Sequence, residues 1–476
     1  MKNIVLLGGS NSVMVNGLQK GLKEYANVTN LALGSSTGIQ NLYELYRIKN
    51  QEAIQNADLI ITESNINEVH NNSNTLENLP LGIIFKNLQY LYATLYTFNR
   101  PVCILILPFC GENYLIINNM HRFLANYYGL NIVDMQNYYQ NNEIIQFGNK
   151  FGAHQLAAVN RNVGKEIAKN IDIFKISKKS LDINIPEFKI VTPENMQRNG
   201  NFKIFNPNNS MYNEIVYRLE KGNSLSFNDC DGYEIIGMHS WNLENSGEIT
   251  KLGFGIATAH CASIHLRNKN NDIVKPTSKL NIFCEIQAEP KVDSNLIVKF
   301  NDENLDNTEF YHAAFTNRPD YIALPYFDLI AFFLCKPNPK MKLFDLSVIP
   351  TDIDIEIDKD IDRSYLIPNI VFFKDSMEFI DEYIGHLYPN ITKHIDNVLT
   401  PQIVNKVKEQ LSQTKINPQK EPTSTIDLEK QITAKIKNHL SYKLGEALIR
   451  ANKNWYKGGY IKFIFEVMRI NKEHKK

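Results

Sequence analysis

Short apolar runs alternate with amphipathic stretches over the first third of the chain. The stretches carry apolar residues at helical spacing, as in 81–98, which ends before Pro101. The run Val102–Leu107 is apolar at every position, which is typical of a central strand buried on both faces. The runs fall near residues 4–8, 28–33, 58–62, 102–107 and 130–134. Strands that alternate with helices in this way predict a doubly wound α/β domain, with a parallel sheet covered on both faces.

The pattern changes after about residue 180. From Phe188 to about Val348 the apolar runs are short, rich in β-branched and aromatic residues, and separated by asparagine-rich turns. The stretches 281–287 and 295–300 read as strands, and repeated strands without helices between them predict a β-sandwich domain. The segment Asp352–Asp358 alternates acidic residues with isoleucine and predicts one more strand, with a solvated acidic face.

Helical spacing returns near the C-terminus, and the charge becomes basic there. The tail from Lys430 to Lys476 carries 12 Lys and Arg against 3 Glu, a net charge of +9 (12 − 3). Its apolar residues predict two basic amphipathic helices joined by a glycine turn. Such helices either lie on an anionic membrane surface or an acidic partner, or pack on the protein with a solvated charged face.

These changes of pattern divide the 476 residues into five predicted segments, which suits a chain of two or three domains. They are an α/β domain (1–178), a β-sandwich accessory domain (179–365), a helical segment (366–411), a linker (412–425) and the basic helical tail (426–476).

Composition excludes several classes of protein. With 51 basic and 51 acidic residues the formal net charge is zero, which argues against a general nucleic-acid binder. The six cysteines are scattered and lack the close pairing of zinc or redox motifs, so we predict reduced thiols, no metal and no cofactor. The first apolar run is too short for a signal peptide or a membrane span. We therefore expect a cytoplasmic protein, peripheral at the inner membrane face if its tail binds there.

Small polar residues follow three of the predicted strands, and a histidine precedes the last helix of the α/β domain. Ser10 follows two glycines at the end of the first strand, where a hydroxyl at the carboxyl edge of the sheet can act as a nucleophile. The second strand runs into Gly34, and the third runs into Asn67, whose amide can donate to an oxyanion. His154 can act as a general base.

Other interpretations of these residues stay open. The run Gly8–Ser12 follows neither the G-x-G-x-x-G order of dinucleotide folds nor a P-loop, because the next lysine is Lys20. Taken singly, a serine in such a turn caps a helix, an asparagine forms a turn, and a histidine is structural. Their occurrence in order on successive strand ends favours a catalytic site.

In order, spacing and local structure these residues resemble the SGNH (GDSL-like) hydrolase family. The resemblance covers the predicted α/β domain. It implies that Ser10 is the nucleophile and His154 the general base. It also implies an oxyanion hole formed by the N–H groups of Ser10 and Gly34 and by the side-chain amide of Asn67.

Several positions depart from the family pattern. Gly9 stands where the family carries an aspartate before the serine, while Asn65 and Glu68 replace the glycine and aspartate around the key asparagine. Counting along the third strand identifies Asn67, rather than Asn65, as that asparagine.

One departure concerns the orientation of the base. Phe151 lies three residues before His154, where the family carries the aspartate that orients the imidazole. A Ser/His dyad is then one arrangement. Asp134 and Glu143 are the candidate orienting carboxylates from elsewhere in the chain.

Aromatic and polar residues of the predicted sandwich are candidates for carbohydrate binding, and the same positions also suit an apolar core. They are Tyr233, His239, Trp241 and Tyr311.

The tail carries a second resemblance. The stretches 442–449 and 455–462 resemble the C-terminal tail of many bacterial capsule and lipooligosaccharide biosynthesis proteins, including sugar and substituent transferases. This resemblance implies a glycan substrate and a location where cell-surface polysaccharide is assembled.

Three hypotheses follow. The first is a serine esterase or group transferase that moves an acyl or phosphorus-bearing substituent on a cell-surface polysaccharide, through a covalent Ser10 intermediate. The second is a catalytically degenerate SGNH fold that binds glycan or acts as a scaffold in polysaccharide assembly. The third, a nucleotide-sugar glycosyltransferase, rests on the tail alone.

Overall fold

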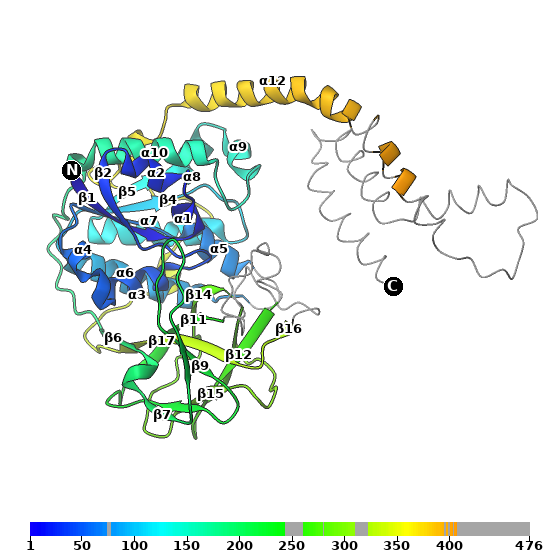
Figure 1. The fold of residues 1–476 in the computed structure, drawn as a ribbon. Helices are drawn as coiled ribbons and strands as arrows, with labels where there is room; N and C mark the ends of the chain where they lie inside the picture. Colours follow the sequence, from blue (N-terminus) through cyan, green and yellow to red (C-terminus); the bar gives the residue numbers. More distant parts are fainter. Residues whose placement is uncertain are drawn as a thin grey trace, which may run out of the picture. The chain divides into compact units, whose positions relative to one another are not determined.

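Five parallel strands form the sheet of the N-terminal part of the chain (Figure 1). In the computed structural model, which describes residues 1–73, 78–242, 260–278, 280–309, 322–394, 397, 400–402 and 404–406, their order is β2-β1-β3-β4-β5. The strands are β1 (Lys2–Gly8), β2 (Ala26–Asn30), β3 (Leu59–Glu63), β4 (Val102–Ile106) and β5 (Asn131–Asp134). The predicted parallel α/β sheet is confirmed.

Helices cover both faces of this sheet. On one face lie α2 (Leu18–Lys23) and α10 (Ala157–Lys169), and on the other α3 (Gly38–Tyr46), α6 (Leu81–Thr97) and α7 (Tyr114–Tyr128) (Figure 1). The shorter helices of this part are α1 (Ser10–Val13), α4 (Gln51–Gln55), α5 (Asn65–Asn72), α8 (Met135–Asn141) and α9 (Ile145–Asn149).

Two glycines bring α2 and α10 into backbone contact. A Cβ atom on Gly21 would lie 1.9 Å from the carbonyl oxygen of Arg161, and one on Gly164 would lie 2.4 Å from that of Leu18. Because real Cβ atoms do not approach so closely, any larger residue would push the helices apart. This contact fixes the position of α10, which begins three residues after His154.

A β-rich region follows, with two six-stranded sheets. One has the order β13-β12-β15-β10-β7, with β16 beside β12, and the other β14-β11-β17-β9-β8, with β6 beside β17. The β-rich region is confirmed, whereas its description as a sandwich stays a prediction. The strands are β6 (Glu187–Val191), β7 (Gln197–Asn199), β8 (Lys203–Phe205), β9 (Val216–Leu219), β10 (Ser224–Ser226), β11 (Glu234–Trp241), β12 (His260–Arg267), β13 (Asp272–Ser278), β14 (Asn281–Glu285), β15 (Ile297–Phe300), β16 (Ile322–Ala323) and β17 (Phe327–Lys336).

The sheet that contains β17 is buried on both faces. Phe332 of β17 belongs to the core shared with the other β-sheet, while Phe333 faces the helices of the α/β part. The ring of Tyr43 on α3 lies 4.7 Å from Phe283 and 5.6 Å from Phe333, measured between ring centroids. Residues on both sides of the predicted boundary at 178 therefore share one apolar core.

The predicted strand Asp352–Asp358 is wrong. Residues 354–358 form no strand and run beside α7, where Asn119 binds the backbone of Ile353 and Ile355 through hydrogen bonds of 2.7 and 2.9 Å. The side chain of Asp354 pairs with Arg122. The alternation reflects packing against a helix, which periodicity alone does not distinguish from a sheet.

The chain divides into two compact units, Met1–Asp375 and Ser376–Lys476. Helix α12 (Ile370–His394) begins in the first unit, where Phe373 packs on Tyr139 with a centroid distance of 5.2 Å. It lies within the predicted helical segment 366–411. The predicted linker 412–425 and tail 426–476 lie outside the described residues.

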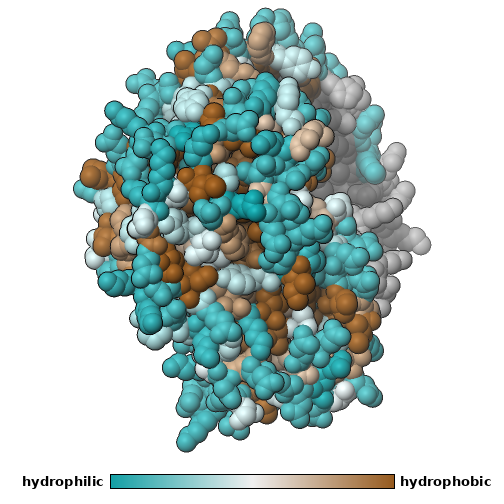
Figure 2. Space-filling view, turned by 90° about the vertical axis from the view of Figure 1, so that its left-hand side faces the viewer, coloured by the Kyte–Doolittle hydropathy of each residue, from teal (hydrophilic) through white to brown (hydrophobic). Residues whose placement is uncertain are grey.

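Three further observations concern the described part of the chain. None of its helices combines the length and the apolar character that a membrane span requires. None of the six cysteines, all within the described residues, forms a disulfide; five of them are buried, and Cys110 is exposed. Figure 2 shows one face on which hydrophobic surface lies in separate patches among hydrophilic residues.

Candidate active site

Ser10 lies where β1 ends and the short helix α1 begins. The carboxylate of Glu63, at the end of β3, lies beneath this turn, and its Oε2 accepts hydrogen bonds from Gly9 N (3.2 Å) and Ser12 Oγ (3.0 Å). A Cβ atom on Gly8 would lie 2.9 Å from that same oxygen. The glycines therefore allow the backbone to close over a buried carboxylate and present the Ser10 side chain at the carboxyl edge of the sheet.

His154 contacts Ser10 directly. Its Nε2 lies 2.8 Å from Ser10 Oγ, although 144 positions separate the two residues. The imidazole is exposed, and the Ser10 side chain is partly buried. The two residues that the sequence assigns to the nucleophile and the base are therefore within proton-transfer distance.

Asn11 fixes the segment that carries the base. Its side chain is buried, and its Nδ2 donates to the carbonyl oxygen of Ala153 at 2.9 Å. Its Oδ1 accepts from the backbone N–H of Gln155 at 3.2 Å and from Asn160 Nδ2 at 3.3 Å. Asn11, which follows Ser10, thus holds both neighbours of His154, a role that the sequence analysis missed.

Asn67 lies against the backbone next to the nucleophile. A Cβ atom on Gly9 would be 1.9 Å from Asn67 Nδ2, so this amide occupies the space that a side chain at position 9 would need. The contact explains why position 9 requires a glycine. Asn67 Nδ2 also donates to Ser36 O at 2.7 Å. Asn65, the other candidate, is the first residue of α5, and its side-chain nitrogen and oxygen bind the backbone of Leu107, directly after β4.

Gly34 lies in the loop after β2, beside the same turn. The N–H of Leu33 donates to Gly8 O at 2.9 Å, which places Gly34 one residue beyond an anchor on β1. A Cβ atom on Gly34 would meet no atom within 4 Å, so this stretch of backbone faces open space. The structure therefore brings Ser10, His154, Gly34 and Asn67 to one edge of the sheet.

The two predicted orienting carboxylates do not contact His154. Asp134 accepts from Arg122 Nε at 2.7 Å through one oxygen and from Asn137 N at 2.9 Å through the other. Glu143 is exposed, and its carboxylate makes no hydrogen bond within the described residues. Asp134 is a candidate from the sequence because it ends a strand. In the structure its carboxylate neutralises the buried guanidinium of Arg122 and does not reach His154.

Phe151 also offers no polar group to the base, because its ring packs on Phe147 with a centroid distance of 5.6 Å. Within the described part of the chain, the His154 imidazole makes one hydrogen bond, to Ser10. The arrangement observed here is a dyad.

A second histidine, not recognised from the sequence, lies close to the base. His70 follows Asn67 by three positions on α5 and stacks on Phe109, with ring centroids 4.7 Å apart. Partial burial, followed by repulsion from the charge of His154, lowers the pKa of His70. Since i and i+3 positions share one face of a helix, His70 is a candidate for contact with a bound substrate.

Burial also changes the acidity of Glu63. It raises the pKa of the carboxyl group to about 7, against the stabilising hydrogen bonds from Ser12 and Gly9. Its Oε1 is buried and has no hydrogen-bond partner among the described residues. Glu63 is the last residue of β3, and nothing in the local sequence indicates that its carboxylate lies beneath the turn at Ser10.

The aromatic residues predicted to bind carbohydrate are in the core. His239, Tyr233 and Trp241 are 0%, 6% and 7% exposed. His239 Nδ1 is 3.2 Å from the Tyr43 hydroxyl, and its Nε2 is 2.7 Å from Asn281 Oδ1. The carbohydrate prediction is wrong for these three residues, because Tyr233 is buried in the core of the β-rich region, while His239 and Trp241 are buried against the α/β part. Tyr311 lies outside the described residues.

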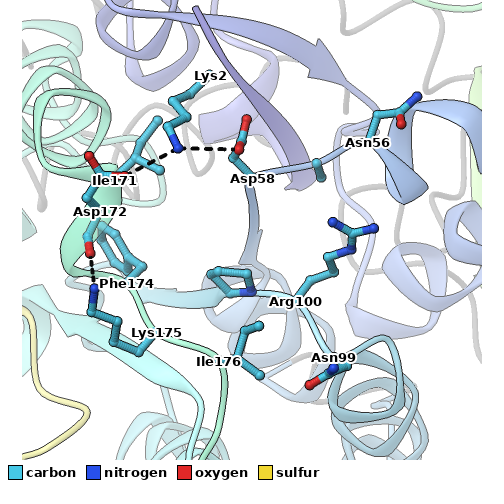
Figure 3. A pocket seen from close by; sticks show the side chains of 12 residues that line it. Lys2, Asn56, Asp58, Asn99, Arg100, Ile171, Asp172, Phe174, Lys175 and Ile176 are labelled. Atoms are coloured by element: carbon cyan, nitrogen blue, oxygen red, sulfur yellow. Dashed lines mark hydrogen bonds and ion pairs between the residues drawn. The ribbon is translucent and has the colours of Figure 1, made fainter.

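A pocket of about 300 Å³ lies at the opposite end of the parallel sheet (Figure 3). Its lining includes Lys2, which pairs with Asp58 and Asp172 at 3.6 and 3.3 Å. These residues lie at the amino ends of the strands, so the pocket is separate from Ser10. In the described part of the chain, no three His, Cys, Asp or Glu side chains are grouped as metal ligands.

Comparisons with known proteins add the following. Residues 406–476 match a family described as a domain of unknown function (DUF8374), and no curated protein matches the chain. The match names no activity.

Solved structures similar to the chain include three esterases. The acetyl xylan esterase AlAXEase is 16% identical, with a TM-score of 0.27, over 35% of this chain and 96% of its own. The esterase EstA from Pseudoalteromonas sp., in a structure inhibited by monoethylphosphonate, is 13% identical, with a TM-score of 0.27, over 36% and 94%. AlinE4, an SGNH-hydrolase family esterase, is 15% identical, with a TM-score of 0.23, over 39% and 87%. At these identities the similarity concerns the fold and does not extend to residues or substrates.

Proposed function

We propose that this protein is a serine esterase or group transferase in which Ser10 is the nucleophile and His154 the general base. The observation that carries the proposal is the 2.8 Å contact between Ser10 Oγ and His154 Nε2 at the carboxyl edge of a parallel sheet. A serine hydroxyl is a weak nucleophile at neutral pH, and an adjacent imidazole that accepts its proton activates it.

The first half-reaction forms a covalent intermediate. Ser10 Oγ attacks the carbonyl carbon of an ester while its proton moves to His154 Nε2. The N–H groups of Ser10 and Gly34 and the Asn67 amide bind the oxygen that becomes negative. When the tetrahedral intermediate collapses, the bond to the leaving alcohol breaks, and His154 returns the proton to that alcohol.

The second half-reaction decides between hydrolysis and transfer. His154 takes a proton from water or from a sugar hydroxyl, and the resulting nucleophile attacks the acyl-Ser10 ester. Ser10 leaves and regains its proton from His154. The exposed position of His154 gives either acceptor access to the base.

For the acceptor we propose a cell-surface polysaccharide such as capsule, and for the transferred group an acyl or a phosphorus-bearing substituent. The support is the resemblance of the stretches 442–449 and 455–462, which lie outside the described residues. A basic tail at an anionic membrane would place the enzyme where such glycans are assembled.

A second candidate function is a degenerate fold that binds glycan or acts as a scaffold. The observation that favours it is the lack of a carboxylate on His154 within the described residues, since removing the carboxylate of a triad lowers kcat by about 10⁴. Glycan binding that survives both Ser10→Ala and His154→Ala, with no turnover by the unaltered protein, would support this candidate.

Steady-state kinetics with p-nitrophenyl acetate and with O-acetylated glycans test the proposal. We expect release of p-nitrophenol with a pre-steady-state burst that corresponds to acylation of Ser10. Ser10→Ala should abolish the burst, and His154→Ala should lower kcat by about 10³ or more. Full activity in Ser10→Ala would contradict the mechanism, and addition of a glycan acceptor distinguishes transfer from hydrolysis.

A further inference from the structure

We propose that the β-rich region positions the Gly34 loop through two side chains, Tyr212 and Glu285, and is thereby part of the catalytic apparatus. The Gly34 loop is defined as residues 31–38, between β2 and α3. The inference rests on the proposed function, because it gives the Gly34 N–H a role in binding the oxyanion. Tyr212 and Glu285 are positioning residues, since they act through the loop.

Tyr212 holds the first part of the Gly34 loop. It lies between β8 and β9 and is buried, and its hydroxyl is 2.9 Å from Leu31 O and 3.2 Å from Ala32 O. Asn209 shapes the turn that carries it, because its Oδ1 accepts from the backbone N–H of Tyr212 at 2.8 Å. Gln40 donates to the tyrosine oxygen at 3.3 Å, so the hydroxyl proton is directed to the loop carbonyls.

Glu285 holds the other end of the Gly34 loop. It is the last residue of β14, and its carboxylate accepts a hydrogen bond from Thr37 Oγ1. Both side chains are buried. Thr37 directly precedes α3 and makes no side-chain cap on that helix, so its hydroxyl serves the contact with Glu285.

The α/β part supplies the inner supports of the same loop. Glu68 accepts from Gly38 N at 2.7 Å, and Asn67 donates to Ser36 O at 2.7 Å. On the other side of Gly34, Leu33 N donates to Gly8 O at 2.9 Å, so contacts within the α/β part flank Gly34, which faces open space, and Ser35, which has a positive φ of 63°. The two contacts from the β-rich region, at Leu31 and Ala32 before Gly34 and at Thr37 after it, lie outside Leu33 and Ser36 and further limit the movement of the Gly34 N–H group.

The energetic consequence concerns the transition state. An oxyanion donor stabilises negative charge best when it is already in place. A donor that must first move into position costs free energy, and this cost offsets the stabilisation of the transition state. Loss of the hydrogen bond from Tyr212 or of the one to Glu285 should therefore lower kcat. KM should stay nearly unchanged, since the ground-state ester carries little charge on its oxygen.

Three variants and one control test this inference. Tyr212→Phe and Thr37→Val remove a single hydroxyl each, and Thr37→Ser restores it. Tyr96→Phe is the matched control, because the Tyr96 hydroxyl also donates to a backbone carbonyl, Lys179 O at 2.7 Å, on a segment distant from Ser10.

For each variant the second-order rate constant of Ser10 labelling by a fluorophosphonate is measured, together with kcat and KM for p-nitrophenyl acetate and the melting temperature. We expect Tyr212→Phe and Thr37→Val to lower the labelling rate and kcat by about tenfold, a part of what the loss of an oxyanion donor costs. KM should change less than about twofold, and Thr37→Ser and Tyr96→Phe should match the unaltered protein.

The outcomes separate the two proposals. If Ser10 of the unaltered protein is not labelled, the proposed function fails. If it is labelled and both variants react at the unaltered rate, or if KM rises while kcat is constant, the positioning role is wrong and the proposed function stands. If Tyr212→Phe does not fold, the comparison of Thr37→Val with Thr37→Ser decides alone.

Discussion

At the scale of single residues, buried polar side chains hold the two reacting groups of the candidate active site. Asn11 and Glu63 are both buried and lie on either side of Ser10, one bound to the His154 segment and the other to the Gly9 backbone. His154 itself is exposed and makes one hydrogen bond among the described residues. Among the described residues Ser10 is therefore the one side chain that His154 hydrogen-bonds, and the position of His154 also depends on its backbone neighbours.

The first prediction concerns Asn11. Asn11→Ala removes the hydrogen bonds to Ala153 and Gln155, so the segment carrying His154 gains freedom, and we expect kcat to fall by about 10- to 100-fold with KM nearly constant. Steady-state kinetics measure the change, and Asn162→Ala on α10, whose amide binds only Ala158 O, is the control. An unchanged kcat in a folded Asn11→Ala protein would show that Asn11 does not position the base.

The second prediction concerns the pH dependence of stability through Glu63. Burial raises the pKa of Glu63 to about 7 from an ordinary value near 4.5, so the folded protein retains a proton that the unfolded chain has already released. The contribution of Glu63 to the free energy of unfolding is therefore fully present below about pH 4.5 and is lost as the pH rises through about 7.

Glu63→Gln removes this dependence. A glutamine oxygen can still accept from Gly9 N and Ser12 Oγ, so the variant should become more stable relative to the unaltered protein between pH 5 and 8, by up to roughly 3 kcal/mol. Urea unfolding at several pH values measures the difference, with Glu166→Gln as an exposed control. A constant difference across this range would mean that Glu63 is ionised throughout.

At the scale of elements, β5 and α7 are joined by a buried ion pair. Arg122 on α7 is bound by Asp134 at the end of β5 and by Asp354 of the segment beside α7. Asp134 also caps α8 by accepting from Asn137 N. The Asp134 carboxylate therefore links one strand to two helices, and Asp354 joins the segment beside α7 to the same guanidinium, which is a structural role.

The third prediction separates that role from catalysis. Asp134→Asn leaves a buried guanidinium without its partner at Nε and should lower the free energy of unfolding by about 3 to 5 kcal/mol. Because Asp134 does not contact His154, kcat per folded molecule should stay within about twofold. Urea unfolding and kinetics well below the melting temperature measure the two effects. A large loss of kcat with normal stability would instead place Asp134 in the active site.

At the scale of the whole molecule, the α/β part and the β-rich region are joined through α3. The ring of Tyr43 on α3 packs on Phe283 and Phe333. Arg47, which directly follows α3, pairs with Glu214 of the β-rich region. The rings of Tyr46 and Tyr90 pack on Phe188 with centroid distances of 5.1 and 5.5 Å. One face of α3 and of α6 is therefore buried against the β-rich region.

The fourth prediction is that residues 1–178 alone do not fold cooperatively. This fragment exposes the apolar face of α3 and α6 and leaves Arg47 without Glu214, whereas the fragment 1–375 keeps both. Thermal unfolding followed by circular dichroism compares the two. A single cooperative transition for 1–178, with Ser10 labelled at the rate of the full chain, would contradict this prediction and the positioning role of Tyr212 and Glu285.

Strand periodicity predicted the parallel sheet, because it is a local signal, whereas the pairing of Ser10 with His154 was implied by the resemblance to the SGNH family. The sequence did not predict the roles of Asn11 and Glu63, since these depend on contacts between segments far apart in the chain. For Trp241 the sequence left both carbohydrate binding and a place in the core open, because periodicity does not show whether both faces of a sheet are covered.

The most direct test of the central claim is to treat the purified full-length protein with a fluorophosphonate and locate the adduct by mass spectrometry of the digested chain. The account predicts one adduct, on Ser10, that is absent in Ser10→Ala and strongly reduced in His154→Ala. Labelling at another residue, or labelling of Ser10 that does not depend on His154, would contradict it.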